Sequence, residues 1–180
     1  KKEDLQQAHA LYEKASKDLK ELKASAAQLQ KILKEAEARR KAEQKRAGQK
    51  QTGAALNIGR NSLPWPVSGK IISKFGKEYQ AQLKTWIFRD GIKIAANKGT
   101  PIVSVAEGSV IFAGEFRSYG NVVIVDHGGG FFTIYGFLSA IRARLGQQVN
   151  KGQIIGLCGT DTQGSAMGSG QSALYFEVRS

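Results

Sequence analysis

The first 48 residues repeat their apolar side chains every three or four positions, and this period restricts the fold more than any other feature. Pro is absent from this stretch, and its only Gly is Gly48. Such spacing over more than four heptads is typical of a coiled coil. A lone helix cannot bury the stripe, so it needs a partner segment, chain or domain. The stripe, called the seam below, consists of Leu5, Ala8, Tyr12, Ala15, Leu19, Leu22, Ala26, Leu29, Leu33 and Ala36.

The helical period ends near Gly48, and the rest of the chain has a different pattern. Residues 49–61 are polar, contain two Gly and are typical of a linker. Beyond Pro64, short β-rich runs alternate with Gly, with turn signals every 8–12 residues, which favours an all-β sandwich or barrel. We therefore expect α and β structure in separate regions: a coiled-coil helix over 1–48, a linker over 49–61 and a mainly antiparallel all-β domain over 62–180. The clearest strand signals are at 71–72, 102–105, 110–112, 122–125, 131–135 and 174–178.

The net charge of +12 raises the question of nucleic-acid binding. Residues 1–50 carry 14 Lys and Arg against 8 Asp and Glu, and residues 51–180 carry 13 against 7, so each part has a net charge of +6. A nucleic-acid site normally gathers its cations on one face. The even spread argues against a nucleic-acid partner and suits an anionic envelope polymer or an acidic protein.

Several short motifs follow one another through the β-rich region. In order, they include Trp65-Pro66-Val67-Ser68-Gly69, Gly91-Ile92-Lys93-Ile94-Ala95-Ala96, Glu107-Gly108-Ser109-Val110, Tyr119-Gly120-Asn121, Tyr135-Gly136-Phe137-Leu138 and Leu174-Tyr175-Phe176-Glu177-Val178. Each motif alone is weak, but the ordered set resembles the LytM, or lysostaphin-like, family of zinc metallopeptidases, which cut peptidoglycan cross-links. The resemblance covers about residues 62–180 and implies the fold of that family.

The resemblance also shows where the zinc-binding and catalytic side chains of active members would lie. The His-x-Gly-x-Asp motif falls on Arg89 and Lys93, and an offset of one residue would place Asp90 at the first position. The Tyr-x-His position is Phe137, and the His-x-His pair has become Ala173 and Tyr175. A catalytic zinc needs about three protein ligands. We therefore expect no bound metal, no cofactor, no catalytic residue and no peptidase activity.

If the zinc chemistry is lost, the strands that formed the substrate groove still fix its walls. Aromatic side chains beside cations are typical of binding hot spots between proteins. We expect a partner-binding groove here, although Tyr119, Tyr135 and Phe137 could instead simply fill the vacated pocket. The groove is predicted to contain Arg89, Lys93, Tyr119, Tyr135, Phe137, Tyr175 and Arg179.

A coiled coil, a linker and a degenerate LytM domain together resemble the EnvC-type murein hydrolase activators. The resemblance implies an exported, periplasmic protein, with any signal peptide upstream of this fragment. It implies a zinc-dependent N-acetylmuramoyl-L-alanine amidase as the partner, activated for daughter-cell separation, and a membrane division complex that contacts the coiled coil. The amidase segment is expected to be a helix with acidic and apolar faces.

Two further points remain open at the level of sequence. The linker and the end of the helical arm, about Ala36 to Asn61, are tethered beside the groove and could occlude it. The alternative functions are a non-catalytic scaffold that docks another envelope protein without activating an enzyme, and direct binding of peptidoglycan through the old substrate groove.

Overall fold

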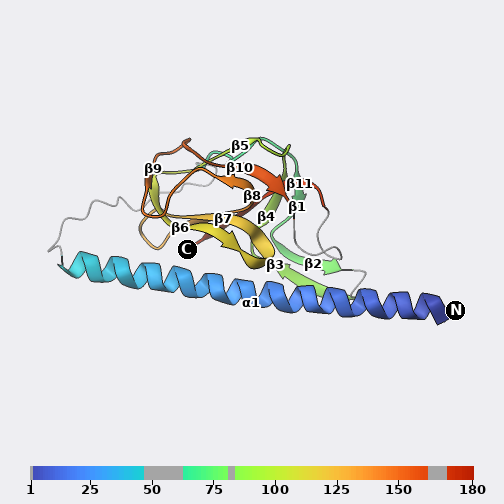
Figure 1. The fold of residues 1–180 in the computed structure, drawn as a ribbon. Coiled ribbons are helices and arrows are strands. Elements are labelled where there is room, and N and C mark those ends of the chain that lie inside the picture. Colours follow the sequence, from blue (N-terminus) through green and yellow to red (C-terminus); the bar gives the residue numbers. More distant parts are fainter. Residues whose placement is uncertain (1, 47–62, 81–83, 162–169) are drawn as a thin grey trace.

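A computed structural model describes residues 2–46, 63–80, 84–161 and 170–180 of the chain. The predicted linker, 49–61, lies outside the described residues. Helix α1 (Lys2–Arg46) is one continuous helix that crosses one side of the β-domain and extends beyond it at the N-terminal end (Figure 1). Among the described residues, no helix combines the length and the hydropathy of a membrane span.

The β-domain consists of eleven strands and one short 3-10 helix within the described residues. The elements are β1 (Ile71–Ser73), β2 (Gly76–Gln80), β3 (Thr85–Arg89), β4 (Ile92–Ala95), β5 (Pro101–Val103), β6 (Gly108–Phe116), η1 (Arg117–Tyr119), β7 (Gly120–Asp126), β8 (Phe132–Ile141), β9 (Gln148–Val149), β10 (Ile154–Thr160) and β11 (Ser172–Arg179).

Nine of these strands form one sheet in the order β1-β4-β11-β10-β8-β7-β6-β9, with β5 paired to β10 and an additional pairing of β11 with β8. Strands β2 and β3 form a separate two-stranded sheet, which lies beside α1 in Figure 1. The described strand pairs are antiparallel. This arrangement confirms the predicted fold class, a helix followed by a mainly antiparallel β-domain.

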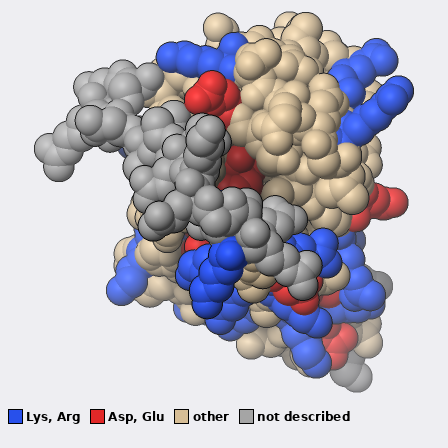
Figure 2. Space-filling model, turned by 90° about the vertical axis from the view of Figure 1, so that its left-hand side faces the viewer, with Lys and Arg blue, Asp and Glu red and all other residues tan. Residues whose placement is uncertain are grey.

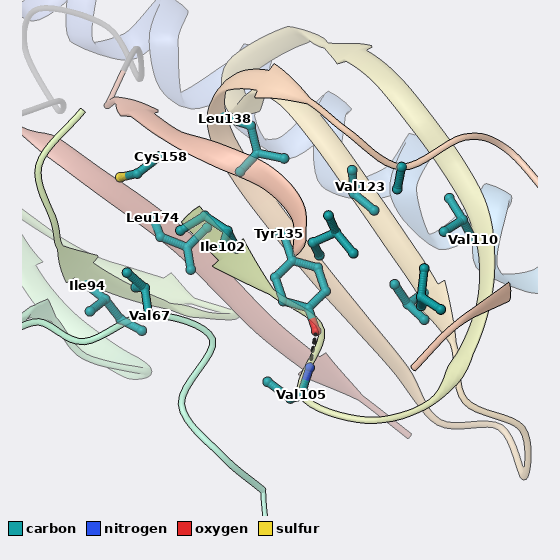
Figure 3. Close-up of a cluster of buried hydrophobic side chains, with 14 residues drawn as sticks. Val67, Ile94, Ile102, Val105, Val110, Val123, Tyr135, Leu138, Cys158 and Leu174 are labelled. Atoms are coloured by element: carbon teal, nitrogen blue, oxygen red, sulfur yellow. Dashed lines mark hydrogen bonds between the residues drawn. The ribbon is translucent and has the colours of Figure 1, made fainter. Parts of the chain in front are cut away.

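The nine-stranded sheet buries apolar side chains on both of its faces. In β7, Val123 and Val125 point into one cluster, whereas Val122 and Ile124 point into another, as the period of two in a strand requires. The first cluster, here called the inner core, lies inside the β-domain and surrounds Tyr135 (Figure 3). The phenol oxygen of Tyr135 accepts hydrogen bonds from the backbone N–H of Val105 and from the Thr133 hydroxyl, both at 3.1 Å, so this buried polar group is satisfied.

The second cluster, here called the outer core, lies between the sheet and α1. The helix contributes Leu29 and Leu33, which are buried against Phe116, Ile124 and other residues of the sheet and η1. From Ala15 to Ala36 every seam residue is buried or half-buried, while Leu5 and Tyr12 remain largely exposed. The seam therefore finds its partner within its own chain over this stretch, and pairing with a second helix stays a prediction for the N-terminal part.

Two polar contacts also join the helix to the β-domain. The hydroxyls of Ser25 and Ser118 lie 3.2 Å apart, and Nη1 of Arg40 donates to Oδ1 of Asp126 at 3.3 Å. Asp126 also accepts a hydrogen bond from the backbone N–H of Gly128, which fixes the carboxylate in place. The charges on the face shown in Figure 2 are of mixed sign, with Lys and Arg interspersed with Asp and Glu.

Candidate functional site

A pocket of about 330 Å³ lies between α1 and the β-domain. One wall is the helix, and the opposite wall is β3 with the residues that follow it. Four of the seven predicted groove residues line it: Arg89, Lys93, Tyr119 and Tyr175. The other lining residues are Leu19, Leu22, Lys23, Ala26, Ser73, Thr85, Trp86, Ile87, Phe88, Asp90 and Gly91.

Lys93 forms a buried ion pair beside this pocket. Its Nζ donates to Oδ2 of Asp161 at 2.6 Å and lies 5.3 Å from the centre of the Phe137 ring. Burial lowers the pKa of the Lys93 ammonium, while its hydrogen bond to Asp161 acts in the opposite direction. Because strand β4 pairs with β11, Lys93 also lies in register with Tyr175. The ammonium is therefore held by a carboxylate and a ring, in the arrangement expected of a buried cation.

Three aromatic rings pack together beside Lys93. The rings of Tyr119 and Tyr175 lie 4.7 Å apart, and Phe137 lies about 6 Å from both, at 6.4 and 6.0 Å. Glycine is required at position 91, because a Cβ on Gly91 would come within 2.8 Å of the Tyr175 ring. Phe137 has a φ of 59°, an unusual conformation for a residue with a side chain. These contacts fix the positions of the rings.

Hydrogen bonds to the Glu177 carboxylate hold the aromatic group in place. The phenol of Tyr175 donates to Oε2 of Glu177 at 2.7 Å, and Arg179 donates to the other carboxylate oxygen. Burial raises the pKa of the Glu177 carboxyl, although both hydrogen bonds favour its charged form. Burial raises the pKa of Tyr119 to about 12 and raises that of Tyr175 as well, so both phenols stay protonated at neutral pH.

The three cations predicted for the groove all have acidic partners in the structure. Arg89 donates to Glu78 across the β2–β3 pair, Lys93 binds Asp161, and Arg179 binds Glu177 and lies 3.9 Å from Asp90. The sequence did not reveal these partners. Asp161 is 68 positions from Lys93, and only the fold brings the two side chains together.

The remaining predicted residues lie outside the pocket lining. Phe137 packs against the tyrosine rings on the side away from the pocket, and Arg179 donates a hydrogen bond to Glu177. Tyr135 faces the opposite side of the sheet, in the inner core, and does not join the aromatic group. The helix residues that line the pocket, Leu19, Leu22, Lys23 and Ala26, lie before the segment 36–61 that was expected to occlude the groove, of which residues 47–61 lie outside the described residues. The seam, which contains Leu19, Leu22 and Ala26, was the sequence signal for this wall.

His127, the only His of the β-domain, is held by structural contacts. Its Nδ1 lies 2.6 Å from the backbone carbonyl of Glu107, and its Nε2 lies 2.7 Å from the Thr133 hydroxyl. Burial lowers the pKa of the imidazole, which therefore stays neutral. Since it belongs to the far end of β7 and β8, it has no role in the pocket.

The side chains at the positions of the family's zinc ligands do not fit a zinc ion. Arg89 and Lys93 are cations and would repel a dication at short range. The third ligand position is taken by Tyr175, whose protonated phenol donates to Glu177. Within residues 2–46, 63–80, 84–161 and 170–180, no group of three His, Cys, Asp or Glu side chains is placed to hold a metal.

Comparison with known proteins agrees with this fold. The model of peptidase family M23 matches residues 87–180, more than half of the chain. The murein hydrolase activator EnvC of Escherichia coli is 37% identical over 124 residues, which are 69% of this chain and 27% of that protein. The cell division protein DipM of Caulobacter vibrioides is 36% identical over 122 residues, 67% of this chain and 18% of that protein.

Solved structures show the same relationship. A putative M23 peptidase from Pseudomonas aeruginosa is similar with a TM-score of 0.53 and 32% identity, covering 79% of this chain and 54% of that one. The chain thus spans about a quarter or less of the two curated relatives and about half of the solved chain. On the match of fold, motif order and family model, the chain belongs to peptidase family M23.

Proposed function

We propose that this chain is a non-catalytic regulator of the cell envelope that binds and activates a peptidoglycan amidase. The observation that carries the proposal is the groove under α1, where aromatic rings and paired cations stand in place of a zinc site and the chain's own helix lies across them. Two similar proteins, EnvC and DipM, are named as a murein hydrolase activator and a cell division protein. Both names support a role in cell-wall remodelling.

Absence of peptidase activity follows from the donor set. The positions that would hold zinc carry Arg89, Lys93 and Tyr175, and Ala173 and Phe137 take the places of the two catalytic His residues. The ammonium of Lys93, paired with Asp161, places a positive charge of the protein itself where the zinc ion would lie. A groove that lacks the catalytic side chains but keeps ordered aromatic rings and cations is suited to binding a protein partner.

Helix α1 acts in this proposal as an arm that occludes the groove. Leu22 and Ala26 line the pocket and Leu29 packs on its aromatic group, so a partner reaches these rings only after the helix moves. Because the arm is tethered to the β-domain, it competes at high effective concentration. Binding of the partner then becomes a switch between a docked and a released arm.

The partner segment must resemble the arm that it replaces. The arm presents an amphipathic helical face, so we propose an amidase helix with an apolar stripe flanked by acidic residues that meet Arg89 and Lys93. Placement in the periplasm and a membrane division complex that pulls on the N-terminal part of α1 complete the proposal. The exposed Leu5 and Tyr12 of the seam are the surface available for such a contact.

The proposal is tested by releasing the arm within the full chain. Leu29→Asp with Leu33→Asp places two charges in the outer core and is expected to raise the rate at which a purified amidase releases dye from labelled murein. Leu5→Asp with Leu11→Asp is the matched control, since it makes the same change at two exposed positions of the same helix. A further Tyr119→Ala in the released chain should reduce the stimulation.

Each result has a definite meaning. Equal stimulation by the wild-type and released chains would contradict occlusion, and no stimulation by either would contradict the activator role. If the released chain binds the amidase without stimulating it, the chain is a scaffold. Retention on purified murein without any amidase binding would instead support a peptidoglycan-binding protein.

A further inference from the structure

The β2–β3 hairpin displays four aromatic rings on its outer face. Phe75, Tyr79, Trp86 and Phe88 are 65%, 50%, 67% and 55% exposed. Tyr79 is in register with Trp86, and Lys77 is in register with Phe88, so these side chains share one face of the two-stranded sheet. Exposed apolar groups gathered in this way mark an interaction surface.

The opposite face of the hairpin is used for folding. Ile87 is buried, and Arg89 is paired with Glu78 at the margin of the pocket. These contacts anchor the hairpin to the rest of the domain. The outer rings contribute little to that anchoring, because most of their surface remains in water, although Trp86 and Phe88 reach the lining of the pocket. Stability of the fold therefore does not explain the aromatic composition of the outer face.

The charges beside these rings are mostly positive. Lys74, Lys77 and Lys84 are exposed within or next to the hairpin. Glu78 alternates to the inner face and binds Arg89, and Asp90, the residue after β3, lies 3.9 Å from Arg179. The outer face thus combines aromatic rings with three exposed lysines, and the carboxylates of Glu78 and Asp90 each lie beside an arginine.

We propose that this aromatic face, Phe75, Tyr79, Trp86 and Phe88 with the adjoining lysines, binds the surface of an anionic phospholipid bilayer. Trp and Tyr prefer the interface between acyl chains and water, and lysines beside them reach the lipid phosphates. This face adjoins the amidase groove, because Trp86 and Phe88 also line the pocket, and it adds a second contact to the proposed function.

The geometry favours a lipid surface over two other partners. The rings meet edge to face, at 83° for Phe75 with Phe88 and 62° for Tyr79 with Trp86, so they present no common flat platform for stacking sugars. The face is two strands wide, and at the pocket that Trp86 and Phe88 reach it is already opposed by α1 of the same chain, which takes the place of a partner helix there. A fluid bilayer needs neither a flat platform nor a groove.

The first experiment places a reporter in the hairpin. The chain has two Trp residues, Trp65 and Trp86, with similar exposure, and only Trp86 lies on the aromatic face. Trp65→Phe leaves Trp86 as the single fluorophore, and Trp86→Phe leaves Trp65 as a matched control. With vesicles of equimolar phosphatidylglycerol and phosphatidylcholine carrying brominated acyl chains, Trp86 is expected to be quenched several-fold more than Trp65. Equal quenching, or none, would overturn the proposal.

The second experiment measures binding by vesicle co-sedimentation of the full chain. Trp86→Ala with Phe88→Ala should abolish co-sedimentation, and Trp65→Ala should leave it unchanged. Vesicles of phosphatidylcholine alone should bind weakly, and binding should fall when the Debye length is shortened from about 10 to about 3 Å with salt. A circular-dichroism melt verifies that each variant is folded.

Other outcomes would identify another partner. Retention on purified murein sacculi but not on vesicles, lost in the double variant, would assign the face to peptidoglycan and overturn the lipid proposal. If the chain does not bind vesicles but binds an amidase, and this binding requires Trp86 and Phe88, the face would be assigned to the protein partner. Neither vesicle experiment contains an amidase, so its failure leaves the activator role untouched.

Discussion

The two apolar cores of this molecule have similar side chains but different dependence on the helix. The inner core comes entirely from the β-domain, where neighbouring strands hold one another in register. The outer core owes Leu29 and Leu33 to a helix that contacts the domain along one stripe. Loss of the inner core means unfolding, whereas the outer core can open by the departure of a single element. Burial alone thus does not distinguish a permanent core from a removable cover.

The largest expected effect breaks the inner core. Leu174 is fully buried in β11, so Leu174→Ala should lower the free energy of unfolding of the β-domain by about 2 to 5 kcal/mol. Chemical denaturation followed by near-ultraviolet circular dichroism measures this. A loss below about 1 kcal/mol would show that the inner core is looser than its burial indicates.

A smaller effect on the β-domain is expected from the outer core. Leu29→Ala removes a buried side chain of similar size, but the helix can detach, so the cost to the domain is limited by the free energy of docking. Hydrogen exchange should show lost protection in α1 while strands β7 and β8 keep most of theirs. Leu11→Ala, at an exposed position of the same helix, should change neither. Equal loss of protection in helix and strands would erase the distinction between the two cores.

His127 makes the stability of the β-domain depend on pH. Its pKa is lowered by burial from 6.5, so the unfolded chain takes up the proton first as the pH falls. The stability due to the neutral imidazole is therefore complete above pH 6.5 and is lost as the pH falls toward the folded-state pKa. His127→Gln should flatten this part of the profile of unfolding free energy against pH. An unchanged slope in His127→Gln would contradict the assignment.

The smallest effect is expected at the edge of the outer core. Arg40→Gln removes the ion pair with Asp126 and should weaken helix docking by about 1 kcal/mol or less, since partly exposed pairs contribute little. Exchange at the C-terminal turns of α1 should become faster, and the melting of the β-domain should stay the same. Arg39→Gln, on an exposed part of the helix, is the control.

The sequence predicted much of this arrangement from local patterns. The apolar run 122–125 corresponds to β7, and the seam residues from Ala15 to Ala36 are the ones that face a partner. The pattern could not identify that partner, because apolar residues spaced three and four positions apart can pack against either a second helix or a sheet. Membership of the family followed from the order of the motifs and is confirmed by the family model.

The details that the sequence left out depend on the fold. Residues two apart in a regular strand share a face, so the sequence grouped Tyr135 with Phe137. An irregularity in the β7–β8 pairing and the φ of 59° at Phe137 interrupt the alternation, so the two rings face opposite sides of β8. The partners of Lys93 and Arg89 come from other strands and loops. The strand predictions did not include the β2–β3 hairpin. Lysine, glutamate and aromatic residues alternate in its strands with the aromatic residues outward, which is the reverse of the pattern of a core-facing strand.

The most direct test of the account fixes the arm in place. The hydroxyls of Ser25 and Ser118 lie 3.2 Å apart, so Ser25→Cys with Ser118→Cys places two thiols within reach of a disulfide between helix and β-domain. Cys158 is buried and leaves this pair undisturbed. Amidase stimulation should be absent in the oxidised double variant and restored by reductant, with each single variant unaffected. Full stimulation by the oxidised, cross-linked chain would contradict the claim that the partner binds where the helix lies.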